Sequence, residues 1–65
     1  MKEQKIIREK YQAYIKEALG KKVNDCFYLC RDNMSRDYWV MLGNNKNIIC
    51  IICENVSTGE FTVIL

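Results

Sequence analysis

A run of six consecutive apolar residues, I-I-C-I-I-C at positions 48–53, constrains this chain more than any other feature. Six residues are too few to span a bilayer as a helix, which takes about 20. The predominance of β-branched isoleucine favours a strand. Side chains of a strand alternate between its two faces, so both faces of this strand are apolar. A strand with one face in water would alternate apolar and polar residues, and we therefore expect both faces of this one to be covered.

The composition is that of one small folded domain, residues 1–65. At 65 residues a single core gives marginal stability, which oligomerisation, metal or disulfides often supplement. Apolar residues make up 49% of the chain, which excludes the disordered class. The net charge of +2 does not by itself argue for nucleic acid as a partner. The charged N-terminus lacks the apolar region of a signal peptide, so we expect a cytoplasmic protein with reduced cysteines and no membrane association.

An amphipathic pattern predicts one helix over residues 3–19. Its apolar residues recur at spacings of three and four, which places them on one face. Gly20 follows where a left-handed C-terminal cap is expected, and Lys21 and Lys22 suit the negative end of the helix dipole. The predicted apolar face consists of Ile7, Tyr11, Tyr14, Ile15, Ala18 and Leu19.

Four strands are predicted after the helix, over residues 23–30, 37–42, 48–55 and 60–65. Segments rich in turn-forming residues separate them, so consecutive strands should be antiparallel neighbours. Gly59 is placed for a three-residue hairpin loop, which would pair Glu54 with Thr62. The expected fold class is α+β, with one N-terminal helix packed on one face of a four-stranded antiparallel meander.

Strand alternation divides the apolar residues between two faces. The register across residues 43–47 decides whether Trp39 and Met41, or Tyr38 and its even-numbered neighbours, face the helix, and we expect Trp39 inside. With Trp39, the predicted core beneath the helix consists of Phe27, Leu29, Ile49, Ile51, Phe61, Val63 and Leu65.

The second face of the predicted sheet is also apolar, and the chain has no second helix to cover it. Exposed apolar patches of this size usually mark an interface. The alternative is a strongly twisted sheet partly covered by lysine and arginine stems. We expect an interface, formed with a second copy through this face or an edge strand, or with a larger cytoplasmic protein. The predicted interface residues are Tyr28, Tyr38, Val40, Ile48, Ile52 and Ile64.

The four cysteines form two closely spaced pairs, Cys26 with Cys30 and Cys50 with Cys53, which makes a structural zinc site an alternative. Strand geometry argues against it. Residues three apart on a strand point to opposite faces, and Cys26 and Cys30 would share a face but lie about 13 Å apart. We therefore expect small buried apolar residues here, and no metal or other cofactor.

Catalysis has few candidate groups in this chain. No histidine is present, and no pair of carboxylates stands out, so we do not expect an enzyme. Binding of single-stranded nucleic acid is a further alternative, because Tyr28, Tyr38 and Trp39 on a sheet could stack on bases. Such a surface also needs a positive groove, which the few basic residues near these strands do not predict.

The sequence therefore predicts a non-enzymatic protein-interaction module. A histidine-free domain that is rich in residues with A/T-rich codons and has an overexposed sheet face is similar to small proteins encoded by phages and mobile elements. Many of those proteins bind and block a larger host protein. We expect an inhibitor of a bacterial host protein, for example a component of a defence system, that acts by steric occlusion.

Overall fold

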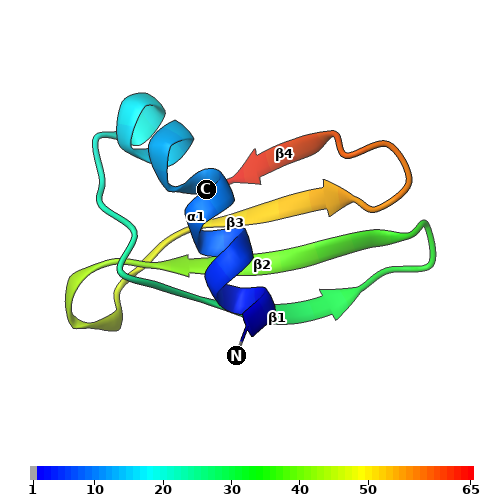
Figure 1. Cartoon of the computed structure of the whole chain (residues 1–65), viewed down its shortest axis with the longest axis horizontal. Helices are drawn as coiled ribbons and strands as arrows, with labels where there is room; N and C mark the ends of the chain where they lie inside the picture. The colour runs from blue at the N-terminus through cyan, green and yellow to red at the C-terminus, as the bar shows by residue number, and fades with distance from the viewer. Residues whose placement is uncertain (1) are drawn as a thin grey trace.

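The computed structural model describes residues 2–65, which form one helix and one four-stranded sheet (Figure 1). The helix α1 spans Lys2–Leu19, and the strands are β1 (Asp25–Arg31), β2 (Arg36–Leu42), β3 (Ile48–Asn55) and β4 (Phe61–Ile64). A short 3-10 turn, η1 (Asn44–Lys46), connects β2 to β3. The strand order is β1-β2-β3-β4 with every pair antiparallel, so the predicted α+β meander is confirmed.

The helix crosses one face of the sheet from β1 toward β4 (Figure 1). Tyr11 and Ile15 are its buried residues, with Ile7 and Leu19 packed beside them. The helix ends as the sequence predicts, because Gly20 has a φ of 67° and its N–H donates to the Lys16 carbonyl at 2.9 Å.

The prediction that Trp39 and Met41 face α1 is confirmed. The predicted faces of β1 and β3 are wrong. On those two strands Cys26, Cys50 and Ile52 face α1, so Phe27 and Ile51 lie on the other face and not in the core. The buried core cluster consists of Tyr11, Ile15, Val23, Cys26, Trp39, Met41, Cys50 and Ile52.

The length of the last hairpin loop explains the error on β3. Asn55 N–H donates to the Glu60 carbonyl and Gly59 N–H to the Asn55 carbonyl, so the loop has one residue more than predicted. Glu54 therefore pairs with Phe61 and not with Thr62. A one-residue change of register reverses the faces of a strand, which brings Cys50 and Ile52 beneath α1.

The other predicted core residues have mixed outcomes. Ile49 and Val63 pack against the core while remaining partly exposed, and Phe61 contacts the rings of Tyr11 and Tyr14 from the edge of the sheet. Leu29 and Leu65 are exposed, so their assignment to the core is wrong. Leu29 sits at a β-bulge between Tyr28 and Cys30, where the chain carries one extra residue.

Candidate interaction surface

The sheet face opposite α1, here called the open face, is apolar and is not covered by any described part of residues 2–65. The strand registers align Phe27, Val40, Ile51 and Ile64 in one row across all four strands. Strand alternation adds further residues on either side of this row. The apolar residues of the open face are Phe27, Cys30, Tyr38, Val40, Leu42, Ile48, Ile51, Cys53 and Ile64.

The exposed area of the open face lies mainly on its outer strands and at one end. Phe27 is 40% exposed, Ile64 42% and Ile48 69%, whereas the central Val40 and Leu42 are buried between their neighbours. With about 200 Å² for a fully exposed large apolar side chain, these three exposed parts amount to roughly 300 Å². This total is comparable to the area of the largest apolar patch on an ordinary monomer, but here it is divided, because the buried Val40 lies between Phe27 and Ile64.

Charged side chains lie only at the two ends of the open face among the described residues. At one end Arg36 Nε lies 2.8 Å from Asp32 Oδ2, and at the other Lys46 Nζ lies 4.0 Å from Asp25 Oδ2. Each end therefore contains one acidic and one basic group. An apolar centre with a polar rim is the usual anatomy of a protein–protein interface.

Asp32 organises the rim at the end of the β1–β2 hairpin. Its Oδ1 accepts the N–H groups of Met34 and Arg36, and its Oδ2 accepts the Tyr38 hydroxyl at 2.8 Å. Burial raises the pKa of Asp32, but these hydrogen bonds, together with that from the Arg36 side chain, lower the pKa to about 2. The hydrogen bonds to Asp32 and then Cys53, followed by burial, raise the pKa of Tyr38 to about 12. The Tyr38 ring is therefore fixed at the rim with its hydroxyl engaged.

Four of the six predicted interface residues lie on the open face: Tyr38, Val40, Ile48 and Ile64. The other two were assigned to the wrong face. Ile52 is 0% exposed beneath α1. Tyr28 lies on the α1 side, with its ring centroid 5.0 Å from that of Trp39 in an edge-to-face arrangement and its hydroxyl donating to Asp37.

Sequence reasoning missed Phe27 and Ile51, which it assigned to the core. Both belong to the central row of the open face. For Ile51 a signal was present in Asn55, whose side-chain Oδ1 accepts the N–H groups of Ser57 and Thr58 and supports the longer hairpin loop. An asparagine in this role is typical of Asx turns.

The cysteines are all free thiols and do not converge on one point. Cys26 and Cys50 belong to the core, whereas Cys53 lies on the open face. The prediction that Cys26 and Cys30 share a face is wrong, because the bulge between them places Cys30 opposite Tyr38 on the other side. Burial raises the pKa of the Cys26 and Cys50 thiols, which disfavours the thiolate that metals and electrophiles require. Within residues 2–65 no group of three potential ligands could hold a metal ion.

The three aromatic residues considered for base stacking do not form one platform. Trp39 is buried, and Tyr28 and Tyr38 lie on opposite faces of the sheet. The adjacent arginines are already paired, since Arg31 donates two hydrogen bonds to Asp37, at 2.6 and 3.0 Å, and Arg36 pairs with Asp32. The Arg31 guanidinium lowers the pKa of Asp37, so this carboxylate stays charged and neutralises the arginine.

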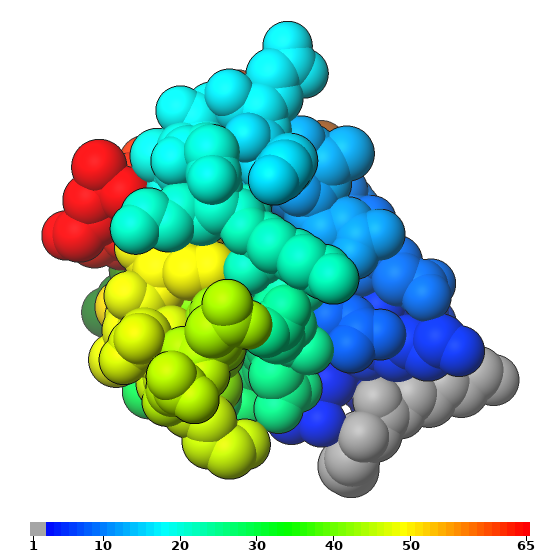
Figure 2. Space-filling model, turned by 90° about the vertical axis from the view of Figure 1, so that its left-hand side faces the viewer, coloured from blue at the N-terminus to red at the C-terminus, as the bar shows by residue number. Residues whose placement is uncertain are grey.

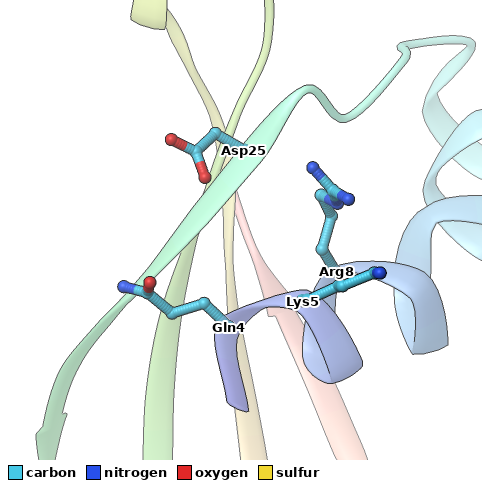
Figure 3. Close-up of a pocket in the computed structure, with 4 residues that line it drawn as sticks. All are labelled: Gln4, Lys5, Arg8 and Asp25. Carbon is cyan, nitrogen blue, oxygen red and sulfur yellow. The ribbon is translucent and has the colours of Figure 1, made fainter. Parts of the chain in front are cut away.

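A shallow pocket lies between the first turns of α1 and the start of β1 (Figure 3). Gln4, Lys5, Arg8 and Asp25 line it, and in the close-up Lys5 and Asp25 extend in opposite directions. Arg8 Nη1 donates to the Asn24 carbonyl at 3.2 Å, which ties α1 to the linker. Because its charged groups do not point to a common centre, this pocket is a weaker candidate than the open face.

The helix α1 does not resemble a membrane span. In the described residues, no helix is both long and apolar enough to cross a bilayer. Comparison of the chain with protein-family models, with curated proteins and with solved structures finds no match.

Proposed function

We propose that this protein is a non-enzymatic interaction module that uses its open face to bind a larger protein and cover part of its surface. The single observation that carries the proposal is the apolar row across all four strands, which the described chain leaves without a second layer. Antiparallel sheets in water normally present one polar face. Here an apolar surface remains in contact with water unless a partner covers it.

The distribution of charge supports a protein surface as the partner. The centre of the open face is apolar, and each rim cluster pairs one acid with one base, so the face has little net charge. A nucleic acid would need an excess of positive charge, which this face does not offer. An apolar protein surface with polar groups at its margin would be complementary.

Steric occlusion is the mechanism that such a face allows. The chain has no histidine, and burial raises the pKa of the Cys26 and Cys50 thiols, so we assign it no chemistry of its own. Free buried cysteines are consistent with a reducing cytoplasm. We propose a bacterial host protein as the target, blocked by having a functional surface covered.

The experiment compares the wild type with Phe27→Lys, which places a charge in the row of the open face. The matched control is Ile6→Lys on α1, because Ile6 is also exposed, at 54%. Each tagged protein is expressed in bacteria and captured, and the retained proteins are identified by mass spectrometry. A target should be retained by the wild type and by Ile6→Lys and lost by Phe27→Lys. The proposal is wrong if Phe27→Lys retains every protein that the wild type retains.

Binding of the dye 1-anilinonaphthalene-8-sulfonate tests the surface directly, without a target. The folded wild type should enhance the fluorescence of the dye, because the dye reports exposed apolar surface. Phe27→Lys should reduce the enhancement and Ile6→Lys should not. Circular dichroism and the fluorescence of Trp39, the single tryptophan, verify that each variant is folded. A wild type that leaves the dye unaffected would contradict an exposed apolar face.

A further inference from the structure

The outer side of β4 carries backbone groups that no described residue satisfies. β4 is the last strand in the sheet order, so only one of its sides pairs with β3. Asn55 N–H donates to the Glu60 carbonyl, and hydrogen-bonded pairs alternate along an antiparallel ladder. Thr62 and Ile64 therefore direct their N–H and C=O groups toward β3. The N–H and C=O groups of Phe61 and Val63 point outward, and those of Leu65 continue this alternation.

The two edges of the sheet differ in how they are protected. β1 carries Asp25 and Arg31 at its ends and a bulge at Leu29, all of which disfavour pairing with another strand. In contrast, residues 61–65 read F-T-V-I-L, without a charge or a proline, and β4 pairs with β3 without a bulge. An unprotected edge of this kind is a template for another strand.

We propose that β4 pairs with β4 of a second copy as an antiparallel ladder centred on Val63. In this register Val63 exchanges two hydrogen bonds with Val63 of the partner subunit. Phe61 of each copy lies opposite Leu65 of the partner subunit, and Thr62 lies opposite Ile64 of the partner subunit. Every cross-strand neighbour is then apolar or threonine, and the charged Glu60 stays outside the ladder.

Exposed apolar side chains at the edge support this register. Leu65 is 86% exposed, and the C-terminal residues protrude from the molecular surface (red in Figure 2). Phe61 is 37% exposed although Tyr11 and Tyr14 pack against it. The ladder would place each Leu65 beside the Phe61 ring of the partner subunit, so that both side chains lose contact with water.

The symmetry of this pairing determines which surfaces lie on each side of the dimer. Two antiparallel edge strands are related by a two-fold axis perpendicular to the sheet. Both copies of α1 therefore lie on one side of a continuous sheet, and both open faces lie on the other. This pairing leaves Phe27 uncovered, so the proposed dimer does not depend on the function proposed above. The dimer would present two open faces and so double the apolar surface available to a target.

Sedimentation velocity in reducing buffer, over a range of protein concentrations, tests the proposal. The wild type should be a dimer. Val63→Pro removes the outward N–H at the centre of the ladder and leaves the inward hydrogen bonds of Thr62 and Ile64 in place, so it should be a folded monomer. Hydrogen exchange should show a Val63 amide that is protected in the wild-type dimer.

A second variant is needed because Val63 also packs against the core. Leu65→Lys changes a side chain that is 86% exposed and places a charge at the edge, and it should weaken the dimer at least tenfold. Met34→Lys, at a position 65% exposed in the β1–β2 turn, is the matched control and should leave the dimer unchanged. A monomeric wild type overturns the proposal, as does a dimer that survives both β4 variants. A dimer lost only in Phe27→Lys would assign self-association to the open face instead.

Discussion

Two isoleucines on β3 provide a direct test of which face of this strand lies beneath the helix. Ile52 is 0% exposed and Ile48 is 69% exposed, although both lie in the same apolar run. Truncation of a buried isoleucine to alanine removes about 2–2.5 kcal/mol of transfer free energy and leaves a cavity, so Ile52→Ala should cost about 3–4 kcal/mol. Ile48 has about a third of its side chain buried, and Ile48→Ala should cost about 0.5–1 kcal/mol.

These costs are large compared with the stability of the chain. A domain of 65 residues has a free energy of unfolding of roughly 3–10 kcal/mol. With a urea dependence of about 1 kcal/mol per molar, Ile52→Ala should lower the unfolding midpoint by about 3 M, and Ile48→Ala by less than about 1 M. Trp39 fluorescence reports the transition, at one fixed protein concentration for all variants. Equal costs for the two substitutions would refute the described register of β3.

Two further predictions concern the rim and the core. Asp32 has a pKa of about 2 in the fold, below the unfolded value of about 4, so its stabilising effect is present above pH ~4 and is lost as the pH falls toward 2. Asp32→Asn should remove this part of the acid sensitivity, as measured by thermal midpoints between pH ~2 and ~7, and an unchanged pH profile would speak against it. At Cys50, which is buried in the core, Cys50→Ser should destabilise by about 1–2 kcal/mol more than Cys50→Ala, because its hydroxyl would lie among apolar groups. Equal urea midpoints for these two variants would show that the surroundings of Cys50 are not apolar.

The sequence predicts the elements of this fold well because their signals are local. The helix has a clear period and a glycine cap at Gly20, and the strands are separated by turn-forming segments. The face of Trp39 and Met41 was also predicted. What could not be predicted is the orientation of β1 and β3. Both faces of each strand are apolar, so alternation does not distinguish them, and for β3 the outcome also depends on one residue of loop length before Glu60.

The candidate surface inherits this ambiguity. The existence of an uncovered apolar face follows from composition, since one helix cannot cover both sides of an apolar sheet. The residues that form this face do not follow from composition. Phe27 was predicted in the core and lies on the open face, whereas Ile52 was predicted on the open face and lies in the core. The bulge at Leu29 adds a second change of register, between β1 and β2. The sequence does not predict it, because leucine has no special preference for bulges.

The apolar character of both faces of β3 also shapes the energy landscape on which the chain folds. A sheet shifted by one residue would still bury isoleucine beneath the helix, so the hydrophobic effect discriminates weakly between the native state and this competitor. Glu54 contributes to this discrimination, because its Oε2 accepts hydrogen bonds from Tyr11 and Lys10 only when this carboxylate faces α1. In a shifted strand Glu54 would face away and leave the Tyr11 hydroxyl buried without its acceptor. The hydrogen bonds to Glu54 therefore add to the free-energy difference that favours the native register.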